Sequence, residues 1–329
     1  MQDHAAQAKV QRKPWVDVLR ALAIFLVMYG HLADPGTGYY VFTSPIKIPL
    51  FFAISGYVFN ARNGDTSAFF KKLLLSLVIP WLALGLCQVV LVLPKGFTKA
   101  GQYVLEVAVG KQFWYMPCCI LAEIILFFGL KFLKKQWQIV AFCLTLTVVG
   151  IVLPNISALD LFKFRTALVA QSFLLIGYSF RRNEEYVNKI KTGWLLIGIA
   201  AYILLGTFSL WCFPGQSLDV NTGSYYNLPL CAVMIALGCF LLFAMFRRIP
   251  RFPKMLQMLG CNTLVFYLFH SNVVLVLAVL GVVLPTTWWG GIVNVLLACV
   301  GCTVIAFILN RFIPEMVGKK RTGKHPAKS

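Results

Sequence analysis

Long apolar runs recur along this chain, and they constrain its fold more than any other feature. An α-helix needs about 20 apolar residues to cross the roughly 30 Å hydrocarbon core of a bilayer, and several runs reach that length. Hydrophobic residues make up 59% of the 329 residues and charged residues 12%, about half the charged share of a soluble domain. A soluble globule, a fibre and a disordered chain are excluded. The sequence predicts an all-α, polytopic membrane protein.

Ten apolar segments, separated by charges, Gly and Pro, are predicted to span the membrane. They lie at residues 15–32, 46–60, 73–93, 114–133, 137–153, 165–180, 194–213, 228–246, 256–284 and 289–313. The second is short, and residues 96–111 are a candidate interfacial helix. We expect an N-terminal tail over 1–14, a transmembrane domain over 15–313 and a basic C-terminal tail over 314–329. No loop is long enough to hold a soluble domain.

The positions of the basic residues predict the orientation. Lys and Arg accumulate in cytoplasmic loops. Twenty-three of the 30 basic residues fall in the tails and alternate loops, six fall in or beside the opposite set, and Arg20 lies inside the first span. Both termini are therefore expected in the cytoplasm, with the protein in the plasma membrane. Topology accounts for the net charge of +19, so we expect no nucleic-acid partner.

The remaining sequence signals are weaker. The first apolar run contains Asp17 and Arg20 and has no convincing cleavage site, which favours a retained span over a signal peptide. Most of the ten cysteines lie in apolar runs, and no Cys and His spacing typical of a metal site occurs, so no metal is expected.

A few ionisable residues lie at membrane depth, where they are costly and by default indicate function. They are Asp17, Arg20, His31, Asp34, Glu123, Arg165 and His270. Arg20 and His31 have the most informative spacing, because eleven steps of about 100° bring them within roughly 20° of one helix face. At 1.5 Å per residue they lie about 16 Å apart along the axis. Alone, Arg20 could snorkel to the inner interface, and His31 could be a satisfied core residue.

A neutral imidazole is a suitable general base for a hydroxyl, and Asp34 follows His31 at a spacing that could orient its ring if the helix continues past Pro35 and Gly36. No serine lies in a nucleophile-elbow context. Direct proton abstraction by His31 is therefore simpler than a covalent serine intermediate.

Four motifs in order give the chain a resemblance to the acyltransferase 3 family of integral-membrane O-acyltransferases, which includes fucose 4-O-acetylase-like proteins. The segment that begins at Trp15 matches the opening of the family, in which Arg20 and His31 fit its Arg/Lys-x10-His motif. Residues 49–57 resemble its second-span signature. Residues 113–117 with Glu123 resemble its Leu-Trp-Phe-Leu-Pro segment. Residues 259–270 are similar to its Gly-x-Asn-Ser and Tyr-x-x-His pattern, although Cys261 departs from it, as Asn60 departs from the second-span pattern.

The resemblance implies a cytoplasmic acetyl-CoA donor, bound as a substrate rather than as a permanent cofactor, and a glycan or glycolipid acceptor reached from the other side. It implies His31 as the essential histidine, His270 as a second catalytic candidate, and binding roles for Arg20, Ser55, Trp114, Tyr115, Glu123, Arg165, Asn262 and Tyr267. Several of these residues also have a structural explanation. Ser55 could serve helix packing, Trp114 and Tyr115 could belong to an interfacial aromatic belt, and Arg165 could contact lipid headgroups. Glu123 and His270 could make structural hydrogen bonds.

Two other classes of function stay open. A transporter or flippase would also use intramembrane charges, although no inverted repeat is evident. Related membrane domains also occur fused to soluble enzymes in membrane-bound serine racemases, but no soluble domain follows here. The acceptor and the oligomeric state are not predicted.

Overall fold

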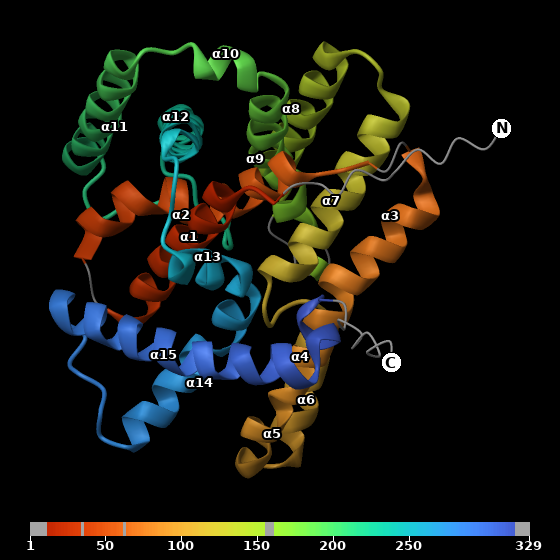
Figure 1. Cartoon of the computed structure of the whole chain (residues 1–329), viewed down its shortest axis with the longest axis vertical. Helices are drawn as coiled ribbons and strands as arrows, with labels where there is room; N and C mark the ends of the chain where they lie inside the picture. Colours follow the sequence, from red (N-terminus) through yellow and green to blue (C-terminus); the bar gives the residue numbers. More distant parts are fainter. Residues whose placement is uncertain (1–11, 34–35, 62–63, 155–160, 320–329) are drawn as a thin grey trace, which may run out of the picture.

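The computed structural model describes residues 12–33, 36–61, 64–154 and 161–319, and within these ranges the chain forms helices and no strand (Figure 1). The predicted all-α class is confirmed. The longer helices are α1 (Pro14–Leu32), α2 (Gly36–Val58), α6 (Phe97–Ala108), α7 (Tyr115–Phe132), α8 (Gln136–Val152), α9 (Phe164–Arg182), α11 (Thr192–Cys212), α12 (Leu228–Arg248), α14 (Thr263–Val279) and α15 (Trp288–Phe312). The shorter ones are α3 (Thr66–Leu73), α4 (Ile79–Cys87), α5 (Val89–Val92), α10 (Glu184–Asn188) and α13 (Lys254–Cys261).

Seven helices in the described ranges have the length and composition to cross a membrane, one of them a continuous stretch from Thr66 to Lys95. An eighth is possible if α13 and α14, which meet at 83°, form one broken span. The expected count of about ten is not confirmed. All ten predicted segments are helical, but α8 has only 17 residues, and Gln171 and terminal arginines make α9 less apolar. The side of the membrane on which the termini lie stays a prediction.

The second span starts earlier than predicted. The helix α2 begins at Gly36 instead of residue 46 and continues through Pro45 and Pro49. An interior proline lacks the N–H that would bond the carbonyl four residues back, which usually ends a helix in water. Packed neighbours make such prolines tolerable in membrane helices.

Two glycines bring α2 and α9 into backbone contact at the centre of the bundle. A Cβ on Gly56 would lie 2.0 Å from the Leu174 carbonyl oxygen, and one on Gly177 would lie 1.7 Å from that of Ala53. Small residues permit such close approach between membrane helices. The contact fixes α2, and with it Ser55.

The helix α1 lies beside α2 in the middle of the molecule, with α11 and α12 on one side and α7, α8 and α9 on the other (Figure 1). Its N-terminal half packs closely on α13, because a Cβ on Gly260 would lie 1.7 Å from the Asp17 carbonyl oxygen. The sharp turn after α13 then directs α14 along the rest of α1. This path brings the Tyr267 and His270 segment beside the face that carries Arg20 and His31.

Candidate functional site

A basic cavity of about 390 Å³ opens at the N-terminal end of α1. Among the described residues its lining includes Arg12, Lys13, Arg20 and Arg181 but only one carboxylate, Asp17. Asp17 is buried and pairs with Arg12 at 2.7 Å and with Arg20 at 3.5 Å. Lys13 in turn pairs with Glu184 at 3.0 Å. Four cations against these two carboxylates still leave the cavity positive, which favours a polyanionic ligand.

An inner cavity of about 220 Å³ adjoins it, since Arg20 and Cys261 line both. Ser55, Tyr115 and Tyr267 also line the inner cavity. The backbone N–H of Tyr115 donates a hydrogen bond to the Tyr267 hydroxyl at 3.3 Å, and the two ring centroids lie 5.9 Å apart. Four predicted residues from four helices therefore meet in one place.

The two predicted histidines form a pair, with ring centroids 5.5 Å apart and planes inclined by 30°. His31 is exposed, whereas His270 is buried. The His270 Nδ1 atom lies 2.8 Å from the Phe266 carbonyl and 3.1 Å from that of Tyr267. A carbonyl only accepts, so Nδ1 carries the proton and the buried Nε2, which has no partner among the described residues, presents a lone pair.

The pair lies one helical turn beyond the inner cavity. Val27 and Tyr267 line that cavity, and they precede His31 and His270 by four and three residues on their helices. Because Arg20, Val27 and His31 share one stripe of α1, the cavity extends from the guanidinium toward the imidazoles.

Four other predicted residues lie outside this cluster. Asn262 ends α13, and its side chain bonds Met258, Asn310 and Lys319 across the 83° turn. Arg165 donates to the Thr222 carbonyl in the loop before α12. Trp114 packs on Tyr115 without lining either cavity. Glu123 follows Tyr115 by two turns of α7, and the charges of Lys72 and Arg20 act on it. Asp34 lies outside the described residues.

The sequence did not indicate Lys47 as a site residue, because it is one of the six basic residues assigned above to the loops opposite the cytoplasmic ones. It belongs to α2 and is half-buried between Pro45 and Pro49. Its Nζ lies 3.5 Å from the position of a Cβ on Gly30, next to His31, and 4.8 Å from the Tyr40 ring centroid. The sequence did contain one signal for it, because a lysine that lies within two residues of two prolines in an apolar segment is unusual enough to be a site candidate.

The family model described as an acyltransferase domain, acyltransferase 3, matches residues 13–311. This chain belongs to the acyltransferase 3 family. The matched range includes both histidines of the pair and almost all the residues that line the two cavities. The chain matches no curated protein sequence and no solved structure.

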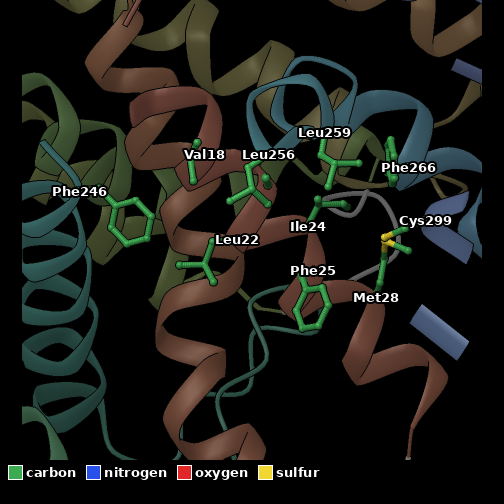
Figure 2. A pocket seen from close by; sticks show the side chains of 11 residues that line it. Val18, Leu22, Ile24, Phe25, Met28, Phe246, Leu256, Leu259, Phe266 and Cys299 are labelled. Atoms are coloured by element: carbon green, nitrogen blue, oxygen red, sulfur yellow. The ribbon is translucent and has the colours of Figure 1, made fainter. Parts of the chain in front are cut away.

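This membrane acyltransferase has a further pocket, of about 240 Å³, on a different face of α1. Figure 2 shows Leu22, Phe25 and Met28 of α1 lining it together with Leu256, Leu259 and Cys299 from other helices. No hydroxyl, imidazole or charged side chain lines it, so apart from the Cys299 thiol it offers no group for acid, base or phosphate chemistry. In the part of the acyltransferase that the structure describes, no three His, Cys, Asp or Glu side chains converge as metal ligands.

Proposed function

We propose that this protein is a membrane O-acetyltransferase that moves an acetyl group from cytoplasmic acetyl-CoA to a hydroxyl of a cell-envelope or exported glycan or glycolipid, in the plasma membrane. One observation carries the proposal. A basic cavity and an inner cavity share Arg20, and the inner cavity ends one turn from the imidazoles of His31 and His270.

The basic cavity is the proposed site for the phosphates of CoA. A guanidinium pairs with phosphate oxygens through two parallel hydrogen bonds, and Arg20 and Arg181 supply two such groups. The extended pantetheine arm would then enter the inner cavity past Ser55 and Tyr115. Its thioester has to advance about 16 Å along α1, from the level of Arg20 to that of His31.

The histidine pair is the proposed site of chemistry. His31 accepts the proton of the acceptor hydroxyl as that oxygen attacks the thioester carbonyl. The new C–O bond forms, the C–S bond breaks, and the proton passes from the imidazole to the CoA sulfur. His270 offers a second acceptor through its Nε2, which has no partner among the residues that the structure describes, while its Nδ1 proton is fixed on backbone carbonyls. Asp34 is the proposed partner that orients His31.

A second candidate is a transporter or flippase for a lipid-linked or small polar substrate. The break between α13 and α14, bent by 83°, favours it, because discontinuous helices form the substrate sites of many transporters.

Proteoliposomes with radiolabelled acetyl-CoA separate the two candidates. The enzyme transfers label to an added cell-envelope glycolipid extract, and mass spectrometry finds acetylated glycan in wild-type but not in deletion-strain envelopes. Passage of the glycolipid across the membrane without any label transfer, and unchanged envelope glycans in the deletion strain, would contradict the acetyltransferase proposal.

A further inference from the structure

Lys47 belongs to the candidate span Gly38–Val58, and within the part of the chain that the structure describes this cation has no counter-charge in direct contact. Among the described residues no carboxylate lies within 4.0 Å of its Nζ, and its one described close partner is the face of the Tyr40 ring. The carboxylate whose field acts on it is that of Asp219. Asp219 uses its two oxygens within its own loop, accepting from Asn221 and Thr222 at 2.9 Å each. An unpaired charge at this depth is costly unless a ligand compensates it.

The fold holds this lysine beside the proposed base. The Tyr40 hydroxyl donates to the Gly30 carbonyl at 2.9 Å, and the Tyr39 hydroxyl donates to that of Leu26. These bonds tie the first turns of α2 to the last turns of α1. The Lys47 ammonium consequently lies against Gly30, the residue that precedes His31. The adjacent Ile48 lines the inner cavity.

We propose that Lys47 forms an anion subsite that holds a phosphate or carboxylate group of the acyl acceptor beside His31. The inference rests on the proposed function and narrows it: the acceptor is an acidic glycan or glycolipid, and the ammonium selects it over a neutral one. The donor's phosphates do not fill this role, because their proposed cations are about 16 Å away along α1. Lys47 thus determines specificity and takes no proton in the reaction.

The test measures binding and transfer separately, with purified protein in phosphatidylcholine nanodiscs. The probes are hexyl glucoside, hexyl glucuronide and a hexyl glucoside monophosphate, which share a sugar and a tail and differ in charge. Wild-type protein is expected to bind at least one charged probe about tenfold more tightly than the neutral one, as for a hydrogen bond to a charged group. Whichever charged probe binds more tightly shows whether the site prefers a carboxylate or a phosphate group on the acceptor.

Three variants assign that preference. Lys47→Met should bring the ratio of charged to neutral affinity close to one, and Lys47→Arg should retain most of it. Lys99→Met, which removes an exposed lysine from α6, should leave the ratio unchanged. Equal affinity of wild-type protein for all three probes would overturn the proposal even if Lys47→Met failed to fold. A preference that survives in folded Lys47→Met would overturn it as well.

Radiolabelled acetyl-CoA added to the same samples tests the proposed function independently. Charge-selective binding without label transfer to any probe or to the glycolipid extract would refute the acetyltransferase and leave the anion subsite in place. Label transfer without charge selectivity would refute the subsite alone.

Discussion

Gly260→Ala should separate α1 from α13 and destabilise the protein. The added Cβ would lie 1.7 Å from the Asp17 carbonyl oxygen and 2.4 Å from its carbon, where ordinary contact begins at 3.4 Å. Both obstacles are backbone atoms of a packed helix, so no rotamer change relieves them, and the helices must move apart by about 1.7 Å along that line. Overpacking of this kind costs about 1–3 kcal/mol, and we expect the upper end of that range.

The matched control is Gly101→Ala in α6, where no heavy atom lies within 4 Å of the added Cβ. Both substitutions gain helix propensity, by up to about 1 kcal/mol. The difference in stability between the two variants therefore isolates the cost of the contact between α13 and the Asp17 carbonyl. Thermal unfolding in one detergent, followed by tryptophan fluorescence, should give a lower midpoint for Gly260→Ala than for wild type and no loss for Gly101→Ala. Because Arg20 is one turn from Asp17, the KM for acetyl-CoA should also rise. Equal midpoints for the two variants would refute the reasoning.

Two further predictions concern charge and hydrogen bonding. Burial alone would raise the pKa of Glu184. Hydrogen bonds from Tyr57 and Lys13 and the charges of Lys13 and Arg247 lower that pKa below its ordinary 4.5. A depressed pKa contributes stability at neutral pH that is lost as pH falls below about 4.5. Glu184→Gln should therefore lower the unfolding midpoint at pH 7 and converge on wild type in acid; a pH-independent difference would contradict this. Asn262→Ala removes the acceptor shared by Asn310 and Lys319 and should cost about 1–3 kcal/mol in the same unfolding assay. Weakened acceptor binding with an unchanged midpoint would make Asn262 a ligand contact instead.

The sequence predicted the features that depend on a single helix. Helical periodicity is enough to place Arg20 and His31 on one stripe of α1, and apolar length is enough to find the helical segments. His270 was found as an ionisable residue at membrane depth, and the resemblance supplied Tyr267. The turn at Asn262 brings both residues to the same stripe. None of these inferences required knowledge of which helices touch.

Features that depend on two helices were not predictable in this way. The backbone contact of Gly56 and Gly177 becomes visible only when α2 and α9 are paired. Lys47 was counted among the outer basic residues because nothing in the sequence places α2 against the end of α1. The resemblance gives Asn262 a binding role, which stays a prediction, and only the structure shows that its side chain bonds neighbours that follow 48 and 57 residues later in the chain.

Steady-state acetyl transfer by purified His31→Ala tests the central claim most directly, with Arg20→Met as its companion at the other end of the stripe. Loss of a general base should lower kcat by about 10²–10⁴-fold with little change in the KM for acetyl-CoA. Arg20→Met should mainly raise that KM. Undiminished kcat in folded His31→Ala, at normal protein levels, would contradict the account.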